Sequence, residues 1–186
     1  MIIGICGKMG SGKTLFATAL AYASYKSGEK IYSNYNLNFP HEIINLDTML
    51  KMELQNATVV IDEIYIFMES RRSSSDINLI LSYFIFQTRK RGVNLIYTAQ
   101  KYSSVDIRLR ELTDYVALAE KEKDNNIFHY TIYKLDTLAH PEQVINLKIG
   151  EQAFNFLKTL YKTDEIIDFR QAQVFRKRKR RYQDVL

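Results

Sequence analysis

The stretch GKMGSGKT occupies residues 7–14, between the apolar run MIIGIC and the helix-forming run LFATALAYASYK. It fits the pattern G-x-x-x-x-G-K-[ST] through Gly7, Gly12, Lys13 and Thr14. The glycines let backbone N–H groups approach phosphate oxygens, and the following helix adds the positive end of its dipole. The stretch therefore predicts a strand, a phosphate-binding loop and a helix at the start of the chain.

The side chains that end this loop predict which ligand it takes. Lys13 would place a positive charge on the β- and γ-phosphates of a nucleotide, and the Thr14 hydroxyl would ligate Mg²⁺. ATP and Mg²⁺ are therefore the expected ligands. The residues expected to contact the nucleotide are Gly7, Lys8, Met9, Gly10, Ser11, Gly12, Lys13 and Thr14.

Two acidic residues end the buried, β-branched run ATVVIDE at residues 57–63. Asp62 is expected to hold the Mg²⁺ with its water shell, and Glu63 to polarise an attacking water as general base. A solvated strand end without a catalytic role is the alternative. The phosphate-binding loop in the same chain favours the catalytic interpretation.

Segments typical of strands and helices alternate along most of the chain. Because parallel strands need crossovers, this alternation predicts an α/β fold with a mostly parallel sheet flanked by helices. DYVALAE and NIFHYTIYKLD instead predict a β-hairpin near the sheet edge. The other predicted elements are strands at MIIGIC, KIYSNYN, ATVVIDE and VNLIYTA, helices at TLFATALAYASYK, at LDTMLKMEL with Asp47 as its cap and from Asp76 to Gly92, and a loop over residues 69–75.

Polar residues stand at both ends of the predicted strand VNLIYTA. Gln100 follows its carboxyl end, where ligands bind in open α/β sheets, and could sense the γ-phosphate or orient water. Arg89 and Arg91 precede the opposite end, so they would reach a neighbouring subunit's γ-phosphate more readily than their own, as an arginine finger. A solvated basic helix end, favoured by the helix dipole, is the alternative.

The size and composition indicate a single intracellular domain. A chain of 186 residues with 46% hydrophobic content is long enough for one core and short for two. Cys6 is the single cysteine and cannot form an internal disulfide, which favours an intracellular protein. No apolar run approaches the roughly 20 residues of a membrane-spanning helix.

The combination of GKMGSGKT, VVIDE and RKRGVNLIYTAQ, followed by VDIRLREL, resembles the FtsK/HerA superfamily of DNA-pumping ATPases. Within it, the chain is similar to genome-packaging ATPases of membrane-containing viruses and to zonula occludens toxin-like assembly ATPases of filamentous phages. LYKTDEII is also similar to a Y-x-T-x-E ending in those relatives. The resemblance covers residues 1–168 and implies a P-loop NTPase fold of the RecA/ASCE-like type.

The resemblance implies a ring of identical subunits, a hexamer or a pentamer, that threads double-stranded DNA through its centre. It assigns Lys13 and Thr14 to the P-loop, Asp62 and Glu63 to the second motif, Gln100 to the sensor and Arg89 to the finger. Capsid or membrane-vertex proteins would be partners, and the host cytoplasm or the virion the location. Toxin-like relatives usually carry a membrane span after the ATPase region, and its absence favours the packaging role.

Positive charge is concentrated at the C-terminal end. Residues 170–186 hold seven Lys or Arg and one acid, so they contribute +6 to a net charge of +5 and leave about −1 for residues 1–169. We therefore expect an ATPase domain over residues 1–169 and a basic tail over residues 170–186. The alternatives are a tail that is solubilising or docks on capsid protein without a role in DNA binding, and an ordinary surface loop at residues 71–72. The residues expected to bind DNA are Arg176, Lys177, Arg178, Lys179, Arg180 and Arg181 in the tail, and Arg71 and Arg72 in the body.

Three other classes of protein compete with this interpretation. A nucleoside kinase shares the loop and the acidic pair, but such enzymes typically carry a four-cysteine zinc site. A GTPase switch would have glycine three residues after Asp62, where Tyr65 stands. A non-enzymatic interaction protein would not need the full set of nucleotide-binding residues.

Overall fold

The computed structural model describes residues 1–44, 54–65, 84, 86, 88, 90–135 and 141–162, without the side chains of residues 141, 143 and 144. Several predictions fall outside these residues. They are the helix capped by Asp47, the loop over residues 69–75 with Arg71 and Arg72, the helix start at Asp76, Arg89, the domain boundary at residue 169, and the basic tail with Arg176, Lys177, Arg178, Lys179, Arg180 and Arg181.

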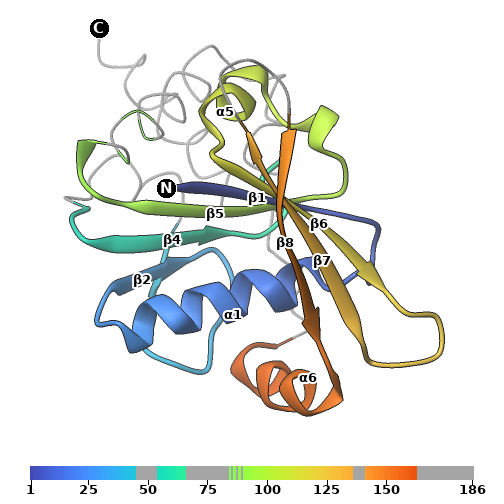
Figure 1. The fold of residues 1–186 in the computed structure, drawn as a ribbon. Helices are drawn as coiled ribbons and strands as arrows, with labels where there is room; N and C mark the ends of the chain where they lie inside the picture. The colour runs from blue at the N-terminus through green and yellow to red at the C-terminus, as the bar shows by residue number, and fades with distance from the viewer. Residues whose placement is uncertain are drawn as a thin grey trace, which may run out of the picture.

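An eight-stranded sheet runs through the molecule in the order β3-β2-β4-β5-β1-β6-β7-β8 (Figure 1). From β3 to β6 all neighbouring strands are parallel, whereas β7 is antiparallel to β6 and β8 is antiparallel to β7. The predicted α/β fold, a mostly parallel sheet with an antiparallel hairpin toward its edge, is confirmed. The strands are β1 Ile2–Cys6, β2 Lys30–Ser33, β3 Glu42–Ile43, β4 Ala57–Ile61, β5 Asn94–Ala99, β6 Tyr115–Lys121, β7 Phe128–Leu135 and β8 Pro141–Ile149.

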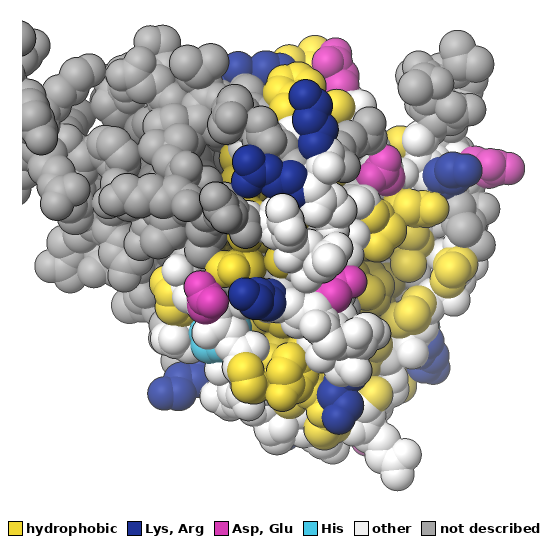
Figure 2. Space-filling view, turned by 90° about the vertical axis from the view of Figure 1, so that its left-hand side faces the viewer, with side chains coloured by type: hydrophobic (Ala, Val, Ile, Leu, Met, Phe, Trp, Pro, Cys, Tyr) yellow, Lys and Arg dark blue, Asp and Glu magenta, His cyan; other side chains and the backbone are white. Residues whose placement is uncertain are grey.

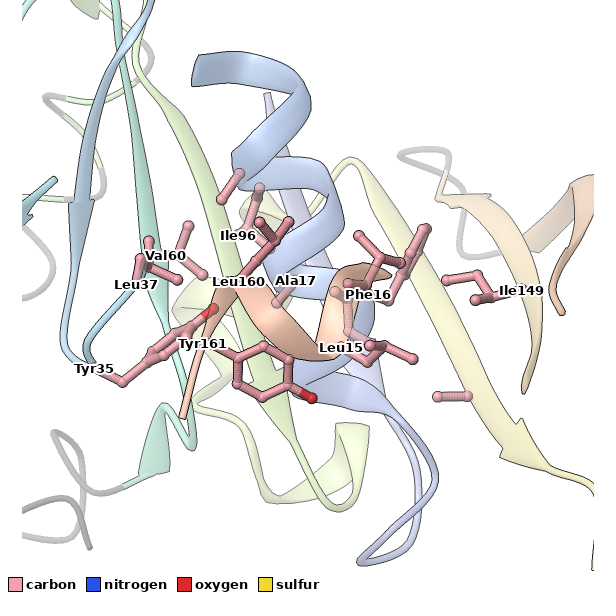
Figure 3. Close-up of a cluster of buried hydrophobic side chains, with 14 of the residues drawn as sticks. Leu15, Phe16, Ala17, Tyr35, Leu37, Val60, Ile96, Ile149, Leu160 and Tyr161 are labelled. Carbon is pink, nitrogen blue, oxygen red and sulfur yellow. The ribbon is translucent and has the colours of Figure 1, made fainter. Parts of the chain in front are cut away.

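Helix α1 (Lys13–Lys26) covers one face of the sheet (Figure 1). Its residues Leu15, Phe16 and Ala17 are buried in one cluster with Val60 of β4 and Ile96 of β5 (Figure 3). Each buried aliphatic or aromatic side chain of this kind stabilises the fold by about 1.5–3 kcal/mol. The packing fixes the first turn of α1, and hence the loop before it, against the middle of the sheet.

The opposite face of the sheet carries a second apolar cluster. Helix α5 (Ile107–Leu112) buries Leu109 there, together with Val59, Leu95 and Tyr97. Val59 and Val60 belong to different clusters because successive side chains of a strand point to opposite faces. Strands buried on both faces explain why these segments read as continuous apolar runs in the sequence.

Strand β8 was not predicted from the sequence. It extends the hairpin β6–β7 by one more antiparallel strand and forms the outer edge of the sheet. Its signal is the alternation of Ile145, Leu147 and Ile149, of which Leu147 and Ile149 belong to the α1-side cluster. Pro141 and the polar residues between these positions weaken that signal, as is usual for an edge strand.

The last described segment returns to the sheet beside β2. Helix α6 (Glu151–Leu157) packs against α1 and is followed by the 3-10 turn η3 (Lys158–Leu160). Tyr161 then pairs with Leu37, and the N–H of Asn38 donates to the carbonyl of Leu160 at 2.7 Å. A further 3-10 turn, η2 (Tyr102–Ser104), follows β5.

On the face shown in Figure 2, the described Lys and Arg side chains stand singly or in small groups among hydrophobic and acidic ones.

Within the described residues, no helix is long and apolar enough to cross a membrane.

Candidate functional site

The candidate site lies where β1, β4 and β5 end at the same edge of the sheet. The pairing of Cys6 with Ala99 and of Ile61 with Tyr97 brings the loop after β1 beside the residues that follow β4. This edge is where ligands bind in open parallel sheets. The fold therefore gathers the loop of residues 7–12 and the Asp62–Glu63 pair, which lie about fifty residues apart in the sequence.

The loop has a backbone conformation that needs its glycines. Gly10 and Gly12 have φ angles of 74° and 90°, in the left-handed region that favours glycine. A Cβ atom at Gly7 would lie 2.5 Å from the Ala119 carbonyl oxygen and 2.5 Å from the Ser11 Oγ. Glycine is thus needed at Gly7 for a close approach and at Gly12 for both its φ angle and its neighbours.

The Lys13 side chain folds back toward the loop that precedes it. It is only 6% exposed, and its Nζ donates to the Lys8 carbonyl at 3.1 Å. The same Nζ lies 3.9 Å from Glu63 Oε1. A positive charge is therefore held, nearly buried, between the loop and the acidic pair.

Two threonines hold the Asp62 carboxylate. Thr14 donates its hydroxyl proton to Asp62 Oδ1 at 3.0 Å, and Thr98 donates to the same oxygen at 2.7 Å. Burial raises the pKa of Asp62, while the two hydroxyls and the charge of Lys13 act in the lowering direction. Thr14 and Asp62, the two predicted Mg²⁺ ligands, thus lie within hydrogen-bond distance of each other.

Asn34 fixes the main chain at the same position. Its side-chain amide donates to the Asp62 carbonyl at 2.9 Å, and its side-chain oxygen accepts from the Asp62 N–H at 2.7 Å. Both backbone groups of Asp62 are therefore bound by one side chain that follows β2. This double contact holds the end of β4 in register with the end of β2.

Glu63 has an unusual backbone for a residue with a side chain. Its φ is 52°, and its N–H donates to Thr98 Oγ1 at 2.8 Å. Burial raises the pKa of the Glu63 carboxyl, and the nearby Lys13 opposes that rise. A left-handed non-glycine residue costs about 1–3 kcal/mol and marks positions with a functional constraint.

Two buried oxygens in the site, Ser11 Oγ and Glu63 Oε2, have no hydrogen-bond partner among the described residues. Buried polar atoms without a partner are rare and call for a ligand or water. Ser11 belongs to the loop that would hold phosphate, and Glu63 is the acid expected to polarise water. The donor set around them, an ammonium, hydroxyls and carboxylates, fits a nucleotide phosphate with Mg²⁺.

The remaining predicted residues are less closely joined to this centre. Gln100 is exposed and directly follows β5, and the N–H of Gly7 donates to the carbonyl of Ala99 at 3.3 Å. Because Gln100 follows Ala99 directly, its main chain lies close to Gly7, the first residue of the loop. Arg91 lies before β5, at the opposite end of that strand.

The sequence analysis assigned no role to Thr98 or Asn34, although both contact Asp62. Thr98 connects both acids, because its hydroxyl donates to Asp62 while accepting from the Glu63 N–H. Its only sequence signal is a hydroxyl side chain near the end of the mostly apolar run VNLIYTA. Asn34 has no signal, because its role depends on the pairing of β2 with β4.

Replacing Thr98 with valine is expected to lower kcat for ATP hydrolysis at least about tenfold. The change leaves the partly buried Glu63 N–H unpaired and removes one of the two hydroxyl hydrogen bonds to Asp62 Oδ1, a cost of about 1–3 kcal/mol. Thr113→Val is the matched control, since that buried threonine pairs with Tyr97 away from the site. Steady-state ATPase assays would measure both variants. Equal losses in the two would contradict a specific role for Thr98.

Comparison with known families and structures agrees with this geometry. The family described as ATPase family associated with various cellular activities (AAA) matches residues 3–120. A search of functionally curated proteins finds no significant match. The matched range begins in β1 and ends in β6, so it contains the loop and both acidic residues.

Several solved structures share the fold. The N-terminal domain of zonular occludens toxin from Neisseria meningitidis is 17% identical with a TM-score of 0.58, covering 87% of this chain and 98% of that chain. The DNA-packaging ATPase B204 from Sulfolobus Turreted Icosahedral Virus is 13% identical with a TM-score of 0.51, covering 77% and 96%. The pCW3 conjugation coupling protein TcpA is 15% identical with a TM-score of 0.55, covering 84% of this chain and 63% of that chain.

At such identities the structures show a common fold. The family match spans more than half of the chain and therefore shows which family the protein belongs to. The protein is a P-loop ATPase that belongs to the AAA family, the ATPase family associated with various cellular activities.

Proposed function

We propose that this ATPase is a DNA translocase of the FtsK/HerA kind that packages double-stranded viral DNA into a capsid. The carrying observation is the joining of Lys13, Thr14, Asp62 and Glu63 in one partly buried site. A fold that spans 96% of the DNA-packaging ATPase B204 supports the specific role. An enzyme of this kind would act in the cytoplasm of an infected cell or at the virion.

The chain's own residues are arranged to support hydrolysis. Lys13 and the loop N–H groups would bind the β- and γ-phosphates, while Thr14 and Asp62 would hold Mg²⁺, which supplies charge stabilisation on the phosphate oxygens. Glu63 would accept the proton of the water that attacks the γ-phosphorus, as the β–γ bond breaks and ADP leaves. Its Oε2, which has no partner among the described residues, is a suitable proton acceptor.

The proposed catalytic site is shared between neighbouring subunits. Gln100 beside the loop would sense the γ-phosphate, and Arg89 would act on the nucleotide of the next subunit in a ring of five or six. Arg91 supports this orientation, because it lies at the end of β5 away from the site of its own subunit. ATP hydrolysis would then depend on assembly.

The basic tail is proposed to bind the DNA backbone. Removing residues 176–186 should weaken binding of double-stranded DNA and reduce the slope of log affinity against log salt by up to about five, because each neutralised phosphate contributes about 0.9. Fluorescence anisotropy at several salt concentrations would measure this. An unchanged slope would reject a role of the tail in DNA binding.

A toxin-like phage assembly or extrusion ATPase is the second candidate. Its supporting observation is the similarity in fold to the N-terminal domain of zonular occludens toxin. This chain covers 98% of that domain. Movement along DNA separates the two candidates. A translocase would displace a third strand from a DNA triplex in the presence of ATP, and the Glu63→Gln variant would not. Triplex that stays intact with an actively hydrolysing enzyme would reject the packaging role.

A further inference from the structure

We propose that Tyr130 of β7 is a positioning residue that sets the phosphate-binding loop through the Gly12 peptide group. The inference rests on the nucleotide site proposed above and adds a strand to it. Tyr130 lies outside residues 3–120, the range that the AAA family matches. The antiparallel part of the sheet would thus contribute to nucleotide binding through the loop.

One hydrogen bond joins the two segments. The Tyr130 hydroxyl donates to the Gly12 carbonyl at 2.9 Å, across 118 residues of sequence. The same carbonyl accepts the N–H of Phe16 at 3.0 Å, the first hydrogen bond of α1. The Gly12 carbonyl is therefore held both by the helix it precedes and by β7.

The orientation of this carbonyl decides the direction of a phosphate-binding group. A peptide unit is planar and trans, so the Gly12 carbonyl and the Lys13 N–H point in opposite directions along one plane. Fixing the carbonyl toward Tyr130 therefore also fixes the direction of the Lys13 N–H, away from Tyr130. The N–H groups of such loops bind phosphate oxygens, so Tyr130 aims one of them without touching the nucleotide.

The tyrosine ring is held too firmly to turn away. It is 1% exposed and stacks on Phe16 with 4.3 Å between ring centroids. A Cβ atom at Gly12 would meet Phe128 Cδ1 at 2.5 Å and Tyr130 Oη at 2.7 Å, so both β7 side chains lie directly under the loop. Burial raises the pKa of Tyr130, which keeps its hydroxyl protonated as a donor.

β7 is itself fixed by its neighbours. It pairs with β6 from Phe128 to Lys134 and with β8 from Phe128 to Leu135. Gly12 is thereby supported from a part of the sheet that does not include β1, the strand from which the loop begins. Removing only the hydroxyl should loosen the Gly12 peptide while leaving the ring stack and the sheet in place.

The test compares Tyr130→Phe with Tyr97→Phe in the full-length chain. Both remove one hydroxyl from a buried tyrosine, and Tyr97 bonds to Thr113 at 2.8 Å on the other face of the sheet. Isothermal titration calorimetry with ADP and Mg²⁺, without DNA, measures Kd. We expect Tyr130→Phe to raise Kd about five- to tenfold and Tyr97→Phe to change it less than about twofold.

Steady-state kinetics adds a readout that general destabilisation would not give. The KM for ATP should rise in Tyr130→Phe while kcat stays within about twofold, because the loop binds ground state and transition state alike. An unchanged Kd in Tyr130→Phe, or equal weakening in both tyrosine variants, would overturn the inference. DNA-independent hydrolysis would overturn the translocase proposal but leave this result standing, whereas a wild-type chain that binds no ADP would overturn both.

Discussion

Replacing Glu63 with glutamine should lower ATP hydrolysis about 10²–10⁴-fold while leaving ATP binding intact. The amide keeps the shape of the side chain but cannot accept the proton of the attacking water. Lys13, 3.9 Å from Glu63 Oε1, remains available for phosphate. Single-turnover hydrolysis and ATP titration by calorimetry would measure the two effects separately. Hydrolysis within about tenfold of wild type would assign the general base to another residue.

The same variant provides its own stability control. The pKa of Glu63 is raised in the folded chain, so the proton is held more tightly there than in the unfolded chain. The resulting stabilisation is complete below the ordinary pKa and is lost as pH rises through the higher folded value. At a pH above the folded pKa, the ionised carboxyl therefore opposes folding. Glu63→Gln should be at least as stable as wild type in urea unfolding on that side of the pKa, so lost activity would not reflect lost structure.

Replacing Gly12 with alanine should give the largest loss of stability in the site, about 2–6 kcal/mol. The alanine would combine a φ angle of 90° with a Cβ atom placed 2.5 Å from Phe128 Cδ1. The first effect costs about 1–3 kcal/mol, and overpacking a tight interior adds about 1–3 kcal/mol. The stacked and buried Tyr130 ring leaves little room for relaxation. Chemical denaturation would measure the change.

Gly28→Ala is the matched control for that substitution. Gly28 has a φ of 89°, but a Cβ atom there would have nothing within 4 Å. It should therefore show the backbone cost alone and keep nucleotide affinity. If Gly12→Ala were no less stable than Gly28→Ala, the close packing of β7 under the loop would not matter for stability.

The sequence was sufficient to predict the centre of the fold. The spacing of the loop glycines and Lys13 identifies the phosphate-binding loop, and strands buried on both faces can be recognised as apolar runs. These features made the parallel sheet and the β6–β7 hairpin predictable. Strand β8 escaped because an edge strand buries less, so polar residues and Pro141 interrupt its alternation.

Only those site residues that belong to a local sequence motif could be predicted from the sequence. Asp62 and Glu63 follow a strand, and their nearness to Lys13 follows from parallel strands ending at one edge. Thr98, Asn34 and Tyr130 act through pairing register and long-range packing, which no local pattern encodes. Their partners lie 28 to 118 residues away in the sequence.

The rate of ATP hydrolysis with and without double-stranded DNA is the decisive measurement for a DNA translocase, with Lys13→Ala as the negative control. Lys13 is the buried cation placed between the loop and Glu63, so its loss should remove hydrolysis in both conditions. We expect double-stranded DNA to stimulate ATP hydrolysis by the wild type and to leave the rate of Lys13→Ala at background. Hydrolysis that is indifferent to DNA, or that survives in Lys13→Ala, would contradict this expectation.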